Sequence, residues 1–217
     1  MIGVRRKAGV LASSDGGEGL LRNVYWGRVE LDGESGMKSA TDLNATPQRN
    51  ASDVACRVAD ILSDAKANLV ASLPDNWIAP MIRHFDADNR FRHVPVNREE
   101  SAVGLCSGAF FTGAPGVALI GASGFLTCVY AITKINYTYQ IPILFLITMR
   151  GDPGDSARYH VSNGLYLRAV MDAIDIPFID IDRYEDLEKI GVAYRHMSVI
   201  GRPYVVGMSR DVLRGNC

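Results

Sequence analysis

Residues whose side chains could do chemistry are concentrated in four short segments of this chain. The segments are SLPDNW at 72–77, NREES at 97–101, GASGF at 121–125 and MRGDPGD at 149–155. They contain carboxylates that can share a proton, arginines that can bind an anion, and glycines that let a ligand approach the backbone. Because these segments hold nearly all residues of the domain that stand out in this way, we expect the functional site to be built from them.

The second segment places a carboxylate at the start of a helix. Residues 93–113, HVPVNREESAVGLCSGAFFTG, read as a strand that leads directly into a helix, with Glu99 at the junction. Small residues follow on what we expect to be one helix face, which another helix can approach closely: Ala102, Gly104, Ser107, Gly108 and Ala109. On spacing alone, Glu99 and Glu100 could simply complement the helix dipole, because acidic first turns are common.

The rest of the sequence alternates short apolar strands with helices. We expect strands at 68–73, 91–96, 117–121, 143–149, 178–181 and 204–208. We expect helices at 77–85, 99–111, 124–137, 157–173 and 183–198. They follow a first helix that is capped by Ser52 or Asp53 and whose apolar face carries Val54, Val58, Ile61 and Leu62.

This alternation predicts βαβ units and therefore a parallel sheet. The strands are continuously apolar, which is typical of strands that are buried on both faces. The predicted fold class is α/β, with three layers: a mainly parallel six-stranded sheet and helices on both of its faces. Ligands bind beyond the carboxyl ends of the strands in such a sheet, and the four segments described above lie at those ends.

Length, charge and cysteine content limit the class of protein. The chain has 217 residues and a formal net charge of −1, which argues against broad binding to nucleic acid or to an anionic membrane. We expect one domain over residues 51–217, preceded by a flexible N-terminal extension over residues 1–50. The longest apolar run, residues 141–149, is too short to cross a bilayer. Four scattered cysteines without a CxxC pair predict no metal site and a cytoplasmic location.

Several of these motifs resemble one enzyme family. Glu99 and Gly108, nine residues apart, resemble the glutamate and glycine of the pyrimidine-binding domain of thiamine-diphosphate enzymes. More narrowly, HVPVNREESAVGLCSGA is similar to the sulfopyruvate and phosphonopyruvate decarboxylases, as are LPDNW, RGDPGD and the spacing of His160 and Gly164. The resemblance covers roughly residues 50–215. The chain departs from it at 122–127, where ASGFLT replaces a segment that commonly contains two asparagines.

The resemblance implies a cofactor role for one group of residues. In the family, a glutamate, here Glu99, hydrogen-bonds N1′ of the aminopyrimidine ring and is the catalytic residue of this domain. That contact favours the imino tautomer, whose exocyclic nitrogen takes the proton from the thiazolium C2. The residues that the resemblance assigns to cofactor binding are Glu99, Pro74, Ser123 and Gly124.

The resemblance assigns a second group, Asp75, Arg150 and His160, to the substrate. Arg150 would bind an anionic group, and Asp75 and His160 would bind substrate or transfer a proton. Two simpler interpretations stay open, because Arg150 can be an ordinary surface cation and a histidine outside a defined constellation is more often structural.

The resemblance also implies a second chain. The family holds the diphosphate of thiamine diphosphate and a Mg²⁺ ion in a domain with a Gly-Asp-Gly motif. Here the two Gly-Asp pairs, at 151–152 and 154–155, are not followed by glycine. We therefore expect a partner β subunit that supplies this domain, an active site between the chains, and an α2β2 or larger assembly.

The expected reaction is the decarboxylation of a 2-oxo acid, 3-sulfopyruvate or 3-phosphonopyruvate, to the aldehyde and CO2. Two alternatives stay open. The chain could be a subunit that acts on another 2-oxo acid, or a partner-binding domain that keeps the fold and has lost cofactor use.

Overall fold

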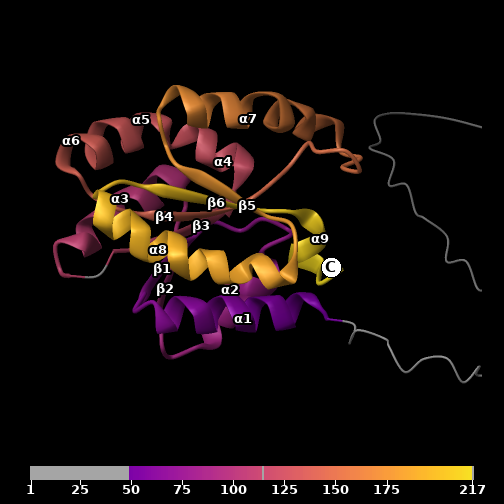
Figure 1. The fold of residues 1–217 in the computed structure, drawn as a ribbon, viewed down its shortest axis with the longest axis horizontal. Helices are drawn as coiled ribbons and strands as arrows, with labels where there is room; N and C mark the ends of the chain where they lie inside the picture. The colour runs from indigo at the N-terminus through magenta and orange to yellow at the C-terminus, as the bar shows by residue number, and fades with distance from the viewer. Residues whose placement is uncertain (1–48, 114, 217) are drawn as a thin grey trace, which may run out of the picture. The chain divides into compact units, whose positions relative to one another are not determined.

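A computed structural model of the chain describes residues 49–113 and 115–216 (Figure 1). The extension expected over residues 1–50 lies outside these ranges except for its last two residues, so it stays a prediction. The described residues form one α/β unit.

The centre of this unit is a six-stranded sheet with the strand order β2-β1-β3-β4-β6-β5. All five pairs of neighbouring strands are parallel, which confirms the predicted fold class. The strands are β1 Leu69–Ser72, β2 Arg92–Pro95, β3 Val117–Gly121, β4 Leu144–Thr148, β5 Phe178–Ile181 and β6 Tyr204–Met208. β3, β5 and β6 have the bounds expected from the sequence.

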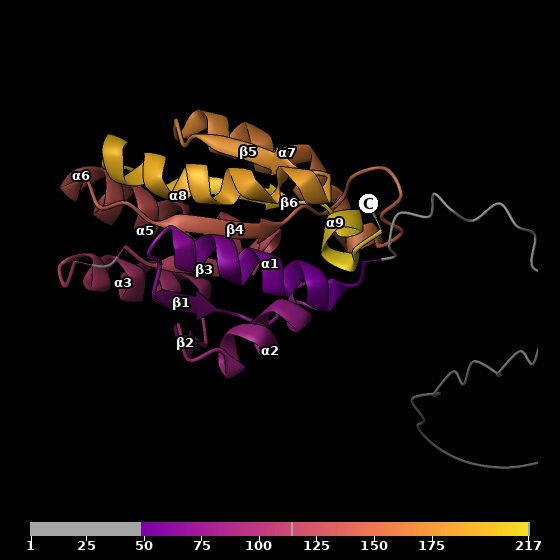
Figure 2. The ribbon, with the colours of Figure 1, turned by 60° about the horizontal axis from the view of Figure 1, so that its bottom comes forward.

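Helices cover both faces of the sheet. One face packs against α1 Ala51–Asp64, α2 Ala79–Ala87, α8 Glu188–Ile200 and α9 Arg210–Arg214. The other face packs against α3 Glu99–Phe110, α4 Ala122–Thr127, α5 Val129–Ala131 and α7 Val161–Ala173. α6, Tyr137–Tyr139, lies beyond α5 in the chain and is joined to it by a short turn (Figure 1). Figure 2 shows α1 and α8 side by side across the first face.

The strands divide their side chains between two hydrophobic cores. In β3, Val117 and Leu119 belong to the core under α1 and α8, while Ala118 and Ile120 belong to the core under α3 and α4. Complete burial of a large aliphatic or aromatic side chain contributes about 1.5–3 kcal/mol. This doubly covered sheet therefore fixes the strand ends, and with them the loops that carry the candidate residues.

The strand order brings the loops after β1 and β3 together. The chain passes from β1 outward to β2 and then returns to β3 on the other side of β1. At such a switch point, the connections after the two neighbouring strands separate and leave a crevice beyond their carboxyl ends. β4, the next neighbour of β3, adds its own loop at the same edge of the sheet.

The helix expected over 124–137 is broken into shorter pieces. α4 and α5 are followed by a π-helical turn, η1 Ile132–Asn136, and then by α6. Threonine hydroxyls bond to nearby backbone carbonyls here: Thr127 Oγ1 donates to the oxygen of Gly124 at 2.8 Å, and Thr133 Oγ1 to that of Val129 at 3.0 Å. Such bonds compete with regular helix bonds and bend helices.

Two other expected helices begin with a 3₁₀ turn, η2 Arg158–His160 before α7 and η3 Tyr184–Leu187 before α8. The short helix α9 was not expected from the sequence.

The small residues of α3 do not share one face, contrary to the expectation. Ala102 and Ser107 are buried, at 0% and 4% exposure. Gly104 and Gly108 face outward, and no described atom beyond their chain neighbours and the adjoining backbone of α3 lies within 4 Å of the place where a Cβ would stand. An α-helix has 3.6 residues per turn, so residues two positions apart, such as Ala102 and Gly104, point in nearly opposite directions.

The cap of α1 is Asn50, whereas Ser52 or Asp53 was expected. Asn50 Oδ1 accepts hydrogen bonds from the backbone N–H groups of Ser52 at 2.8 Å and Asp53 at 3.2 Å. The Asp53 carboxylate accepts in return from the N–H of Asn50 at 2.9 Å. This reciprocal arrangement is a capping box, with an asparagine in the position of the usual serine or threonine.

We predict that Asn50→Ala lowers the free energy of unfolding by about 1 kcal/mol, because two helix N–H groups lose their acceptor. Urea unfolding of the full chain measures this. Ser52→Ala is the matched control and should change the value by less than about 0.5 kcal/mol. An equal loss in both variants would show that Asn50 is not the cap.

Candidate active site

All seven candidate residues line one small cavity at the carboxyl end of the sheet. The cavity has a volume of about 110 Å³. Its lining consists of Leu73, Pro74, Asp75, Glu99, Gly121, Ala122, Ser123, Gly124, Arg150 and His160. Leu73, Gly121 and Ala122 were not among the candidates. The structure thus brings together residues that are up to 86 positions apart, while their roles in binding stay predictions.

Glu99 lies directly against Gly124. Glu99 is in the first turn of α3, and Gly124 is in α4, which packs on the same face of the sheet. A Cβ placed on Gly124 would stand 2.5 Å from Cδ of Glu99, which is closer than real Cβ contacts come. The glycine therefore gives the glutamate side chain its place in the cavity wall.

The carboxylate of Glu99 has no hydrogen-bond or ion-pair partner among residues 49–113 and 115–216. An acidic residue that only complements the helix dipole need not line a cavity, whereas Glu99 does. Glu99 thus differs from Asp75, whose carboxylate is already engaged, and remains available to a ligand.

Cys128 lies near both acids at the start of α3, and its thiol is buried. Burial, with a smaller contribution from the charges of Glu100 and Glu99, raises the pKa of the Cys128 thiol to about 12. A hydrogen bond with Thr127 opposes this rise only in part. The thiol stays protonated near neutral pH, and a thiolate is needed for nucleophilic attack.

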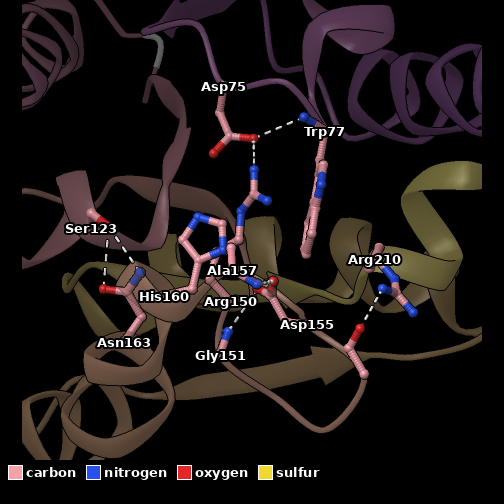
Figure 3. A network of polar contacts seen from close by, with 11 residues as sticks. Asp75, Trp77, Ser123, Arg150, Gly151, Asp155, Ala157, His160, Asn163 and Arg210 are labelled. Atoms are coloured by element: carbon pink, nitrogen blue, oxygen red, sulfur yellow. Dashed lines mark hydrogen bonds and ion pairs between the residues drawn. The ribbon is translucent and has the colours of Figure 1, made fainter. Parts of the chain in front are cut away.

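Asp75 and Arg150 form an ion pair between the loops after β1 and β4 (Figure 3). Asp75 Oδ1 accepts from Nη2 of Arg150 and also from the backbone N–H of Trp77 at 2.8 Å. The latter bond closes an Asx turn that shapes the loop. A Cβ on Gly121 would stand 3.1 Å from Asp75 Oδ2, so this glycine leaves room for the carboxylate.

Arg150 is buried, so the interpretation as an ordinary surface cation is wrong. Only 6% of the residue is exposed, and its guanidinium carbon lies 3.4 Å from the centroid of the Trp77 ring. Its Nε is buried and has no partner among the described residues. An arginine held by a carboxylate and an aromatic face has a fixed orientation.

His160 is held by Asp155, a residue that the sequence motifs alone did not mark as a candidate. His160 Nδ1 lies 2.8 Å from Asp155 Oδ2 (Figure 3). The imidazole also makes edge-on contacts with Tyr159 and Trp77, at centroid distances of 4.3 and 6.3 Å. The one signal in the sequence was the position of Asp155 inside RGDPGD, five residues before the histidine.

Ser123 has a similar unforeseen partner. Its hydroxyl and the side chain of Asn163 exchange two hydrogen bonds, with Nδ2 of Asn163 2.9 Å from Oγ of Ser123 (Figure 3). Asn163 is 2% exposed and lies in α7. Nothing in the local sequence indicates this contact, because the two residues are 40 positions apart.

Within the described ranges, no group of three or more His, Cys, Asp or Glu residues is placed to hold a metal ion. Among the helices of the same residues, none has the length and apolar character needed to cross a membrane.

Comparison with known proteins identifies the family. The family model "Thiamine pyrophosphate enzyme, N-terminal TPP binding domain" matches residues 52–165. The chain belongs to this family. The matched segment contains every residue that lines the cavity.

Similar proteins include sulfopyruvate decarboxylase subunits alpha from two methanogens. The chain is 27% identical to that of Methanococcus maripaludis over 69% of its own length and 89% of the relative's. It is 26% identical to that of Methanocaldococcus jannaschii over 70% and 89%. It is also 29% identical to a phosphonopyruvate decarboxylase of Streptomyces viridochromogenes, over 42% of this chain and 24% of that enzyme.

We predict that Gly124→Ala pushes the Glu99 side chain out of its present position. The contacted atoms belong to a flexible side chain, which can swing away, so the free energy of unfolding should fall by no more than about 1 kcal/mol. A crystal structure of the variant and a urea titration measure the two effects.

Gly104→Ala is the matched control, since its Cβ would meet no described atom within 4 Å beyond its chain neighbours and the adjoining backbone of α3. It should leave Glu99 in place and raise the free energy of unfolding by about 0.5–1 kcal/mol, as expected for glycine to alanine inside a helix. An unmoved Glu99 in Gly124→Ala would contradict the proposed contact.

Proposed function

We propose that this chain is the pyrimidine-binding α subunit of a two-subunit thiamine-diphosphate-dependent decarboxylase. Its substrate would be 3-sulfopyruvate or 3-phosphonopyruvate, and its products the aldehyde and CO2. The observation that carries the proposal is the carboxylate of Glu99 in a cavity wall, without a partner among residues 49–113 and 115–216, in a chain of this cofactor's family. The names of the similar decarboxylases support the reaction and the substrate class.

The described residues fit the aminopyrimidine part of the cofactor. Glu99 would hold a proton at ring atom N1′, because it is the cavity carboxylate without a partner among the described residues. Gly124 would keep that carboxylate in place, and Pro74 and Ser123 would border the ring. When bound, the cofactor supplies a carbon nucleophile and an electron sink for decarboxylation.

Arg150 and His160 would serve the substrate. Arg150 donates to Asp75 through Nη2 and keeps further N–H donors for the carboxylate of a 2-oxo acid. Asp75 and Trp77 would hold the guanidinium so that it meets the substrate in one orientation. His160, on the same cavity, would transfer the proton that the product aldehyde gains.

The charges of the cavity bear on the choice of 2-oxo acid. Among the described residues that line it, Arg150 is the one lysine or arginine, and Asp75 already neutralises part of its charge. A sulfonate or phosphonate would therefore need a second cation, which we assign to the partner subunit. The alternative, a 2-oxo acid without a second anionic group, is favoured by the same observation and by the altered segment at 122–127.

The names of similar proteins and a groove on this chain both support a partner β subunit. Two similar proteins carry the words subunit alpha, and this chain covers only 40% of a longer Methanosarcina acetivorans relative named simply sulfopyruvate decarboxylase. A groove of about 1060 Å³ runs beside α3 and β2 and is bordered by Phe91, Leu105 and the outward-facing Gly104 and Gly108. The β subunit would carry the Gly-Asp-Gly motif and Mg²⁺, in a cytoplasmic α2β2 or larger assembly.

We predict that Glu99→Gln lowers kcat by about 10²–10⁴-fold, because glutamine cannot share a proton with the ring nitrogen. The assay measures aldehyde release by this chain co-purified with a Gly-Asp-Gly chain, with thiamine diphosphate, Mg²⁺ and 3-sulfopyruvate or 3-phosphonopyruvate. Glu100→Gln is the neighbouring control and should lose much less.

Equal losses in Glu99→Gln and Glu100→Gln would show that the wrong carboxylate had been chosen. A wild-type complex that is inactive on both anionic substrates but active on pyruvate would favour the alternative substrate class. A complex that is inactive on all 2-oxo acids would contradict the proposed function.

We predict that Arg150→Lys raises KM for the 2-oxo acid about tenfold or more, with a smaller change in kcat. Lysine keeps the charge but has no planar fork to pair with Asp75 and stack on Trp77. Steady-state kinetics measure this, and thermal melting checks the fold. Arg168→Lys is the matched control, because Arg168 pairs with Asp180 away from the cavity. The same rise in KM in both variants would remove Arg150 from the substrate site.

A further inference from the structure

The contact between Asp155 and His160 is more than a surface ion pair. The side chains are only 9% and 12% exposed, and Nδ1 of His160 lies 2.8 Å from Oδ2 of Asp155. His160 lines the cavity, and its other ring nitrogen, Nε2, has no hydrogen-bond partner among the described residues. Among the described residues, the ring therefore has one bonded nitrogen, Nδ1, and one nitrogen without a partner, Nε2, on the cavity.

Asp155 is itself fixed by the loop that it closes. Its Oδ1 accepts from the N–H of Ala157 at 3.0 Å, and its Oδ2 accepts from the N–H of Gly151 at 3.1 Å (Figure 3). Burial alone would raise the pKa of Asp155, but these two bonds and the contact with His160 outweigh it and lower the pKa. Asp155 is therefore an ionised acceptor that cannot donate a proton to the histidine.

The start of α7 is locked to the same loop by two glycines. Gly151 has a φ of +82°, and a Cβ there would stand 2.7 Å from the backbone nitrogen of Gly164. A Cβ on Gly164 would in turn stand 2.5 Å from the carbonyl oxygen of Gly151. This backbone-to-backbone contact holds His160, at the end of η2, at a set distance from Asp155.

A carboxylate at Nδ1 decides which tautomer a neutral histidine adopts. An ionised acceptor requires the proton to be on Nδ1, and this leaves the lone pair on Nε2. We propose that Asp155 is a positioning residue that keeps a proton on Nδ1 of His160, so that Nε2 is the atom that exchanges a proton with the substrate. The substrate part of this inference rests on the proposed function, whereas the tautomer does not.

The proton balance of decarboxylation gives Nε2 a defined task. The carboxylate of the 2-oxo acid leaves as CO2, and the carbon that it leaves gains one proton to become the aldehyde C–H. A proton passed from Nε2 leaves a neutral imidazole with its other proton on Nδ1, and solvent then restores the proton on Nε2. While His160 is charged, the carboxylate of Asp155 stabilises it. The other charged residues on the cavity are Asp75, Glu99 and Arg150.

The tautomer can be read directly by nitrogen NMR of the full chain labelled with ¹⁵N-histidine. His160 is assigned as the ring that is missing in His160→Gln. At about pH 9, well above the ordinary histidine pKa, the His160 ring should show a protonated Nδ1 and an unprotonated Nε2. Asp155→Ala should move the proton to Nε2. A wild-type ring with its proton on Nε2 would overturn the proposal, whether or not the complex is a decarboxylase.

A kinetic cycle in the holoenzyme tests whether Asp155 acts through His160. Asp155→Asn keeps the shape of the side chain and should lower kcat by about tenfold or more with little change in KM. The double variant Asp155→Asn with His160→Gln should be no slower than His160→Gln alone, because residues that act as a unit are not additive. Multiplied losses in the double variant would overturn the proposal.

Asp152→Asn is the matched control, since Asp152 is an exposed acid of the same loop that does not line the cavity. It should leave both kcat and the His160 tautomer unchanged. If Asp152→Asn lowered kcat as much as Asp155→Asn, the loss would result from the reduced negative charge of the loop and not from the contact with His160, and the proposal would fail.

Discussion

The site depends on one contact, the side chain of Glu99 against the bare backbone of Gly124. The two residues come from separate helices, α3 and α4, that pack on the same face of the sheet. The position of the carboxylate is therefore set by the buried sheet and its helices, and not by a loose loop. Groups held on rigid elements need little reorganisation when a ligand binds, which is what proton sharing with a weakly basic ring nitrogen requires.

The polar residues of the cavity differ in how tightly they are held. Glu99 has no partner among the described residues, whereas Asp75, Arg150 and Trp77 are locked together between the loops after β1 and β4. Asp155 and His160 form a second locked pair beside them. Under the proposed function, the Glu99 carboxylate would serve the cofactor, and the oriented charges of Arg150 and His160 would serve the anionic substrate. The proposed half-site, which a second chain would complete, needs both kinds of residue.

Much of this could be predicted from the sequence, because the signals were local. Short apolar strands between helices predict the parallel sheet, and the parallel sheet predicts that the segments after the strands meet. The motifs around Glu99, Asp75 and Arg150 lie in single stretches of chain and resemble a family, so the amino-acid sequence is enough to select them.

What the sequence did not reveal depends on contacts between distant or inconspicuous residues. The burial of Arg150 follows from the packing of Trp77 over it, and the pairing of Ser123 with Asn163 joins positions 40 residues apart. The capping role of Asn50 was missed because Ser52 and Asp53 are equally good capping residue types. Ala102 and Gly104 point to opposite sides of α3 because they are two positions apart in a helix with 3.6 residues per turn. The expectation of a shared face considered only the small size of these residues.

The role proposed for Glu99 can be tested by a crystal structure of this chain with its partner subunit, thiamine diphosphate and Mg²⁺. The decisive quantity is the distance between the Glu99 carboxylate and N1′ of the aminopyrimidine ring. We expect a charge-assisted hydrogen bond of about 2.6–2.9 Å between these groups. A holoenzyme in which another acid meets N1′, or in which Glu99 faces solvent, would contradict it.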